Sequence, residues 1–120
     1  MKRQTDLCFE DICAYLEQSR LTGGCGACHG GSLPYPPCLL VNELGVFAIN
    51  GGSKEAEAKL RDILDWPQDE LRAIAYMCLA SIEMPGRETG SAMLAFAQRP
   101  ENEEILCFVD RQLGRSNQTN

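Results

Sequence analysis

The spacing of apolar residues in the second half of the chain constrains the fold more than any other feature. Between residues 53 and 113, apolar residues recur every three or four positions, with charged residues between them. This spacing places the apolar side chains on one face of a helix. Proline-containing segments at residues 65–67, 84–86 and 99–100 interrupt the pattern. We therefore expect four amphipathic helices, at about residues 54–64, 68–83, 88–98 and 101–113.

The apolar stripes of these helices predict which side chains face the core. Ser53 is expected to cap the first helix, and Asp69 and Glu70 suit the first turn of the second. The residues expected to face inward from the last two helices are Met93, Leu94, Phe96, Ala97, Ile105, Leu106, Phe108, Val109 and Leu113.

The four helices form two similar units. An offset of 33 residues aligns Leu60 with Met93 and Ile63 with Phe96, and a proline lies between the two helices of each unit. Such a period is typical of stacked helix pairs, although any two amphipathic hairpins share some of this similarity. About three units are usually needed for a stable array. We therefore expect the N-terminal part of the chain to cap the stack.

One stretch carries a resemblance to a known family. Residues 64–75 read Leu-Asp-Trp-Pro-Gln-Asp-Glu-Leu-Arg-Ala-Ile-Ala, which resembles the turn and second helix of a HEAT-type repeat. Asp65 and Arg72 take the places of the turn Asp and helix Arg of that family. In the second unit Gln98 and Leu106 stand there instead, so the resemblance, which covers residues 54–113, is weaker in that unit. It implies a scaffold that binds other macromolecules and carries no chemistry of its own.

The first half of the chain differs in composition. Residues 5–20 have apolar residues at helical spacing, so we expect a short N-terminal helix capped by Thr5. Residues 21–53 contain one charged side chain, Glu43, and eight of the eleven glycines. This favours a Cys-, Gly- and Pro-rich loop followed by a β-hairpin at residues 38–50, with an apolar helix as the alternative. The expected fold is a mainly α, single-domain bundle of residues 1–120, with a polar tail at 114–120.

Charge and hydropathy exclude several classes of function. The net charge is -6 and the cations are scattered, so we expect no nucleic-acid binding. No apolar run is long enough to cross a membrane, and no export signal is visible. Seven cysteines in such a sequence indicate reduced thiols or metal ligands, and hence a cytoplasmic protein.

Residues 25–38 are the chemically distinctive part of the sequence. Cys25 and Cys28 form a Cys-x-x-Cys pair, and Cys38 supplies a third thiol. Zinc prefers four thiolate or imidazole ligands in a tetrahedron. His29, or a thiol of the first helix (Cys8 or Cys13), is a candidate for the fourth. A structural zinc and unligated thiols in a Gly-rich turn are both open interpretations.

The same residues, Cys25-x-x-Cys28-His29, match the attachment signature of c-type haem. The resemblance to a c-type cytochrome extends to Met84 as an axial ligand and to a helix closing the chain. It implies an electron carrier with haem or an iron centre. The five further cysteines and the lack of an export signal argue against it.

Enzymatic chemistry finds little support in the sequence. No helix begins at Cys25, so a redox-active thiol is not favoured, and the only His follows Cys28 directly, which prevents the two side chains from facing each other. The segment at residues 51–54 lacks the Walker spacing. We therefore expect a small non-catalytic module that docks a protein partner through a helix face or through the apolar segment at residues 33–49.

Overall fold

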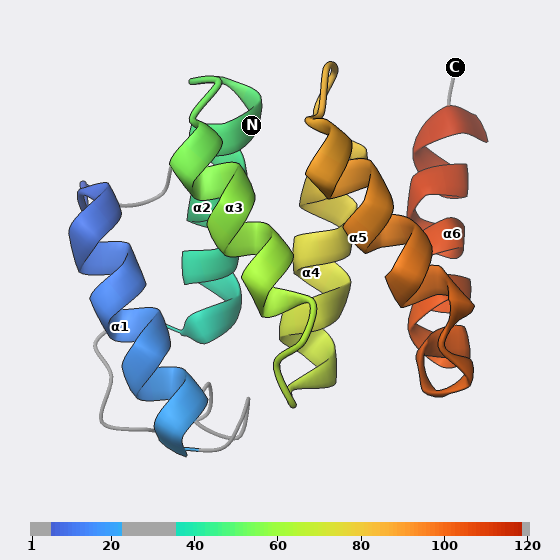
Figure 1. Ribbon diagram of the computed structural model, residues 1–120, viewed down its shortest axis with the longest axis horizontal. Helices are drawn as coiled ribbons and strands as arrows, with labels where there is room; N and C mark the ends of the chain where they lie inside the picture. The colour runs from blue at the N-terminus through green and yellow to red at the C-terminus, as the bar shows by residue number, and fades with distance from the viewer. Residues whose placement is uncertain (1–5, 23–35, 119–120) are drawn as a thin grey trace.

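The computed structural model describes residues 6–22 and 36–118, and these residues form a mainly α-helical bundle (Figure 1). Its elements are α1 (Phe9–Thr22), α2 (Pro37–Ile49), α3 (Lys54–Ile63), α4 (Asp69–Ala80), α5 (Arg87–Gln98), the 3₁₀ turn η2 (Pro100–Asn102) and α6 (Glu103–Gln118). The expected mainly α fold is confirmed. Within this part of the chain no helix is both long and apolar enough to cross a bilayer.

The helices after Ser53 begin within two residues of the expected positions, but α6 continues to Gln118, so most of the tail expected at residues 114–120 is helical. The Ser53 hydroxyl accepts a hydrogen bond from the Ala56 N–H at 3.1 Å, so it caps α3 as predicted. Gly52, just before it, has a φ of 64°, which a glycine adopts without strain. Pro67 and Pro85 lie in the connections that separate α3, α4 and α5.

The β-hairpin expected at residues 38–50 is wrong, because α2 is a helix. Pro37 occupies its first turn, where a proline costs no hydrogen bond, and the helix continues through Asn42 and Gly45. Eight of its residues are buried on more than one side, including Leu40, Val41 and Leu44. A helix buried on most of its surface has no amphipathic period, so its pattern does not distinguish it from two buried strands.

The helices follow one another as consecutive pairs, α1/α2, α3/α4 and α5/α6, which we call the first, second and third helix pair (Figure 1). In that view α2, α4 and α6 all run upward, and each first helix of a pair runs the other way. α2 packs against α1, α3 and α4, and α4 packs against α2, α3, α5 and α6. The N-terminal region therefore forms the first helix pair, and its α2 covers one side of α3 and α4.

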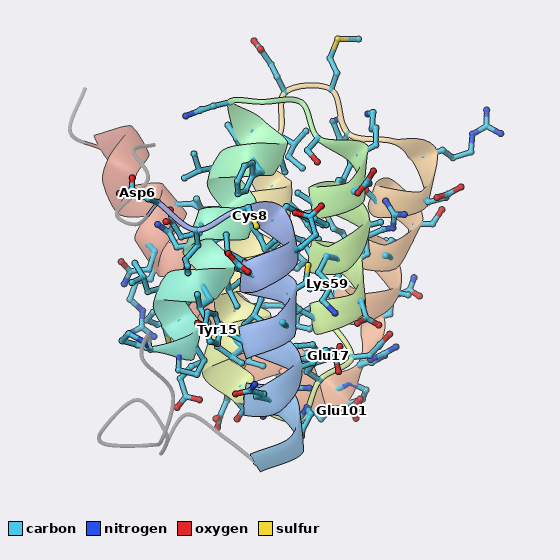
Figure 2. All side chains as sticks on the ribbon, turned by 90° about the vertical axis from the view of Figure 1, so that its left-hand side faces the viewer. Asp6, Cys8, Tyr15, Glu17, Lys59 and Glu101 are labelled. Carbon is cyan, nitrogen blue, oxygen red and sulfur yellow. The ribbon has the colours of Figure 1, made fainter. Side chains whose placement is uncertain are left out.

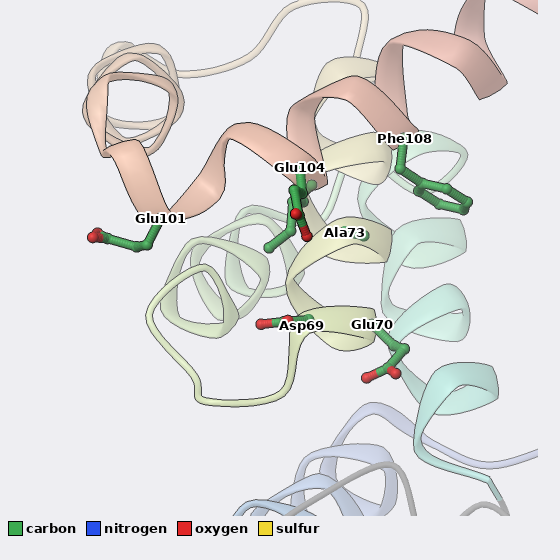
Figure 3. Close-up of a pocket in the computed structure, with 7 residues that line it drawn as sticks. Asp69, Glu70, Ala73, Glu101, Glu104 and Phe108 are labelled. Carbon is green, nitrogen blue, oxygen red and sulfur yellow. The ribbon is translucent and has the colours of Figure 1, made fainter.

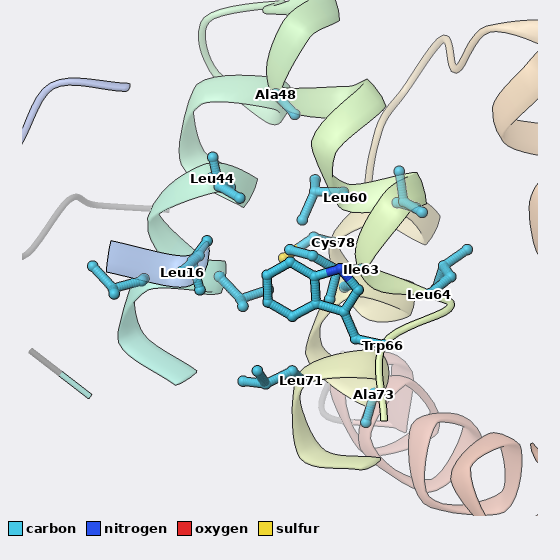
Figure 4. Close-up of a cluster of buried hydrophobic side chains, with 14 of the residues drawn as sticks. Leu16, Leu44, Ala48, Leu60, Ile63, Leu64, Trp66, Leu71, Ala73 and Cys78 are labelled. Carbon is cyan, nitrogen blue, oxygen red and sulfur yellow. The ribbon is translucent and has the colours of Figure 1, made fainter. Parts of the chain in front are cut away.

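The centre of the core lies where α2, α3 and α4 meet. Leu44, Leu60, Ile63 and Leu71 are fully buried there, and Figure 4 shows them around Trp66. The Trp66 indole donates a hydrogen bond to Asp62 Oδ2 at 3.3 Å. Lys59 Nζ lies 5.4 Å from the centroid of the Trp66 ring. The other core residues labelled in Figure 4 are Leu16, Ala48, Leu64, Ala73 and Cys78.

A buried carboxylate joins the α4–α5 connection to α3. The Glu57 side chain is 4% exposed and accepts hydrogen bonds from the Gly86 N–H at 2.8 Å and from the Thr89 hydroxyl. Burial raises the pKa of Glu57, but those two hydrogen bonds and the charge of Lys54 outweigh it and hold the pKa below its ordinary value. Glu57 thus fixes the start of α5.

The two residues singled out by the HEAT-type resemblance both contact the third helix pair. Asp65, in the α3–α4 turn, pairs with Arg99 at 2.9 Å. Arg72 donates a hydrogen bond at 3.2 Å to Asn102, whose amide in turn donates one at 3.0 Å to the carbonyl of Phe96. Each residue therefore links the second helix pair to the α5–α6 turn.

Candidate functional site

A hollow of about 260 Å³ lies between the first turns of α4 and α6 (Figure 3). Its lining combines four carboxylates with three apolar side chains. These residues are Asp69, Glu70, Ala73, Glu101, Glu104, Ile105 and Phe108.

The four carboxylates line one hollow because of how the two helices begin. Asp69 and Glu70 lie in the first turn of α4, and Glu104 lies in the first turn of α6, where acidic side chains stabilise the helix dipole. α4 and α6 run in the same direction and pack against each other, so their acidic ends lie side by side. Glu101 adds a fourth carboxylate from η2.

The charge of this hollow is largely uncompensated. Arg72 pairs with Asp69. Glu70, Glu101 and Glu104 form no ion pair with any other described residue. Figure 3 shows Glu104 pointing between the helices toward Ala73, with Asp69 and Glu70 below it. The hollow therefore presents negative charge over an apolar floor.

The floor is formed by Ala73 and Ile105, which are nearly buried, and by Phe108, which is 45% exposed. Phe108 was expected to face the core, as was Leu94. Both are exposed, and Leu94 at 62% is the more so. Met84 is the third large apolar side chain that is exposed among the described residues, and Phe108 is the one of the three that lines this hollow.

A second hollow follows the first along α4 and carries no charged side chain. It lies between α2, α4 and α6, and its lining residues are Asn42, Ile74, Met77, Cys78, Ser81, Gln112 and Leu113. The lining residues of the two hollows follow helical spacing. One stripe runs along α4 through residues 70, 73, 77 and 81. The other begins in η2 and runs along α6 through residues 101, 105, 108 and 112. We call the two hollows together the α4/α6 groove.

The expected zinc ligands are only partly described by the structure. Cys25, Cys28 and His29 lie outside the described residues. Cys38 lies in the first turn of α2, partly buried against the core. Within residues 6–22 and 36–118, no three His, Cys, Asp or Glu side chains gather where they could hold one metal ion.

Cys8 and Cys38 lie toward opposite ends of the α1/α2 pair. Phe9 contacts Phe47 with ring centroids 6.3 Å apart, so the start of α1 lies beside the end of α2. Cys38 is nine residues before Phe47, which is about 13 Å along a helix. Two thiolates on one zinc lie only about 4 Å apart, given Zn–S bonds of about 2.3 Å.

Three of the described thiols, those of Cys8, Cys13 and Cys78, are not activated nucleophiles. At Cys8 the N–H of Asp11 lowers the pKa, but the carboxylates of Asp11 and Glu10 leave it above its ordinary value. Burial raises the pKa of Cys13, and it raises that of Cys78 to about 12. These three thiols are therefore protonated at neutral pH.

Two further expectations receive no support. The part of the apolar segment that the structure describes, residues 36–49, is mainly the helix α2, which is largely buried; its Asn42 lines the second hollow. Met84, the axial ligand in the haem interpretation, is 83% exposed in the α4–α5 connection. That connection lies at the upper end of the bundle, whereas Cys38 lies in the lower first turn of α2 (Figure 1).

No protein-family model, curated protein or solved structure matches this chain. The function must therefore be argued from the groove itself.

Proposed function

We propose that this chain is a non-catalytic docking module that binds a protein partner in the α4/α6 groove. The observation that carries the proposal is the position of Phe108: a large aromatic side chain, partly exposed, in a hollow with an apolar floor. Aromatic side chains in such positions dominate the binding energy of protein interfaces.

The arrangement in three helix pairs supports a scaffold of the HEAT type. Parallel second helices of successive pairs form a continuous surface, and repeat proteins use such surfaces to bind partners. α2, α4 and α6 are the second helices here, and the α4/α6 groove lies on them. The raised pKa values of Cys8, Cys13 and Cys78 also favour binding over thiol chemistry.

Site-specific crosslinking tests the docking site. A photo-reactive amino acid at position 108 should form an adduct of defined mass in cell extract, whereas the same group at Ser91, exposed on α5 outside the groove, should not. Excess unlabelled wild-type protein should suppress the adduct, and excess Phe108→Ser protein should not. Equal adducts at both positions, or equal competition by the two proteins, would show that the groove is not the docking site.

We also propose that a structural zinc is held by Cys25, Cys28, His29 and Cys38. The favouring observation is that Cys38 lies in the first turn of α2, which contains no acidic residue. The N-terminus of a helix stabilises a thiolate, which is the form that binds zinc. These four side chains would provide a complete tetrahedral set, and the zinc would fix the loop without taking part in chemistry.

Elemental analysis of protein purified without added metal checks this prediction, with one zinc per chain expected. Replacing both Cys25 and Cys28 with Ser should remove the metal and lower the melting temperature, whereas Cys107→Ser, an exposed thiol on α6, should change neither. A metal-free wild-type protein, or an unchanged melting temperature in the double variant, would refute the structural zinc.

A further inference from the structure

We infer that the segment bound in the α4/α6 groove is cationic at one end and apolar at the other. This inference rests on the proposed docking function and adds the chemistry of the partner. It follows from the carboxylates, from their order along the groove and from the floor beneath them.

The carboxylates of the groove have few cationic partners among the described residues. The helix dipole accounts for acidic residues in the first turns of α4 and α6, but it does not require that they remain unpaired. The chain has eleven Lys and Arg residues, yet within the described residues only Arg72 pairs with a carboxylate of this hollow. Glu70, Glu101 and Glu104 are therefore available to a cation from outside.

Charged and apolar side chains follow one another along the groove. The four carboxylates line the hollow at the first turns of α4 and α6, where Phe108 also lies, and the second hollow is lined by uncharged side chains such as Met77 and Leu113. The lining residues of the groove extend from Asp69 at the start of α4 to Ser81 just after its end, twelve residues further along the chain, which is about 18 Å along a helix. That length fits a helical segment of about twelve residues or an extended segment of about five or six.

The apolar floor of the first hollow can contact the aliphatic part of a Lys or Arg side chain. The aliphatic part of such a side chain can lie on Ala73 and Ile105 while its charged group reaches Glu70 or Glu104. A guanidinium in this position can also stack on the exposed ring of Phe108. An acidic segment would meet like charge, so the groove selects against it.

Selection from a displayed library of random twelve-residue peptides tests this inference. The wild-type protein is compared with the Glu70→Gln/Glu104→Gln double variant and with Glu55→Gln, which removes a carboxylate exposed on α3. Peptides enriched on the wild type should carry net positive charge, with Lys or Arg grouped toward one end and apolar residues toward the other. Their affinity should fall about tenfold for the double variant and stay unchanged for Glu55→Gln.

The outcomes separate the two proposals. Enrichment of neutral or acidic peptides that no longer bind the Phe108→Ser variant would refute the cationic partner. It would still support docking in the groove. Equal affinity of the double variant and the wild type would have the same meaning. A selection that enriches no peptide dependent on Phe108 would overturn both proposals.

Discussion

At the scale of single residues, Glu57 does more for this fold than its type suggests. A buried carboxylate is unfavourable unless hydrogen bonds and opposite charge surround it. Gly86 and Thr89 donate the hydrogen bonds to Glu57, and Lys54 and Arg61 provide the positive charge. Arg61 also donates a hydrogen bond to the Thr89 hydroxyl at 3.0 Å. The cluster attaches the third helix pair to α3.

Replacing Glu57 with Ala should lower the free energy of unfolding by about 2–3 kcal/mol, because the Gly86 N–H and the Thr89 hydroxyl lose their acceptor. Chemical denaturation measures this change. Glu55→Ala, which removes an exposed carboxylate of the same helix turn, is the matched control and should change the stability by less than about 0.5 kcal/mol. Equal effects of the two substitutions would show that the buried cluster is not stabilising.

The same carboxylate predicts a pH dependence. The folded-state pKa of Glu57 lies below the ordinary value of 4.5, so the folded state favours the ionised form. The contribution of Glu57 to the free energy of unfolding is complete above the unfolded-state pKa, and it is lost as the pH falls through the folded-state pKa. The difference in stability between wild type and Glu57→Gln should therefore be constant from pH 7 to about 5.5 and shrink below about 4.5. A difference that grows as the pH falls would contradict the assigned direction.

At the scale of elements, the sequence predicts the helices that have one apolar and one polar face. It does not predict a helix that is apolar on most sides. The expected helix at 88–98 is observed as α5 (Arg87–Gln98), and the one at 101–113 as η2 followed by α6 (Glu103–Gln118). α2 was missed because almost every side is buried. The α4/α6 groove was missed because it depends on which helices pack together, and an apolar residue such as Phe108 looks the same at the core and at a groove.

Asn42 distinguishes helix from hairpin in α2. In a hairpin, Asn42 would be a turn residue, and Asn42→Ala would weaken the turn. In a helix, alanine has the higher propensity, so the substitution should leave the free energy of unfolding unchanged or raise it by up to about 0.7 kcal/mol. Thermal denaturation measures the change, and a loss of more than about 1 kcal/mol would argue against the helix.

At the scale of the whole molecule, stability should be lower in the third helix pair. In α5 only Thr89 and Phe96 are buried, whereas eight residues of α2 are buried. Stacked helix pairs open from their ends, where each pair has one neighbour and not two. The third pair is the weaker end because it is held by polar contacts such as Arg72–Asn102 and by the packing of Phe96 on Tyr76.

Hydrogen exchange followed by NMR should therefore show amides of α5 and α6 exchanging faster than those of α2 and α4. The expected difference in opening free energy is about 1–3 kcal/mol, as for other sub-global openings. Glu57→Ala should widen it by weakening the attachment of α5. Uniform protection across all described helices would show that the bundle opens as one unit.

The central position of α2 also affects synthesis of the chain. Figure 2 shows α1 in front of α2 and α3, with α4 behind them. α2 ends at Ile49, but α4, one of its main neighbours, ends only at Ala80. About thirty residues must be added in between, which takes roughly 2–6 s at about 5–20 residues per second. During that interval an apolar helix lacks part of its cover, so nascent chains stalled between α2 and α4 should be the form that chaperones bind.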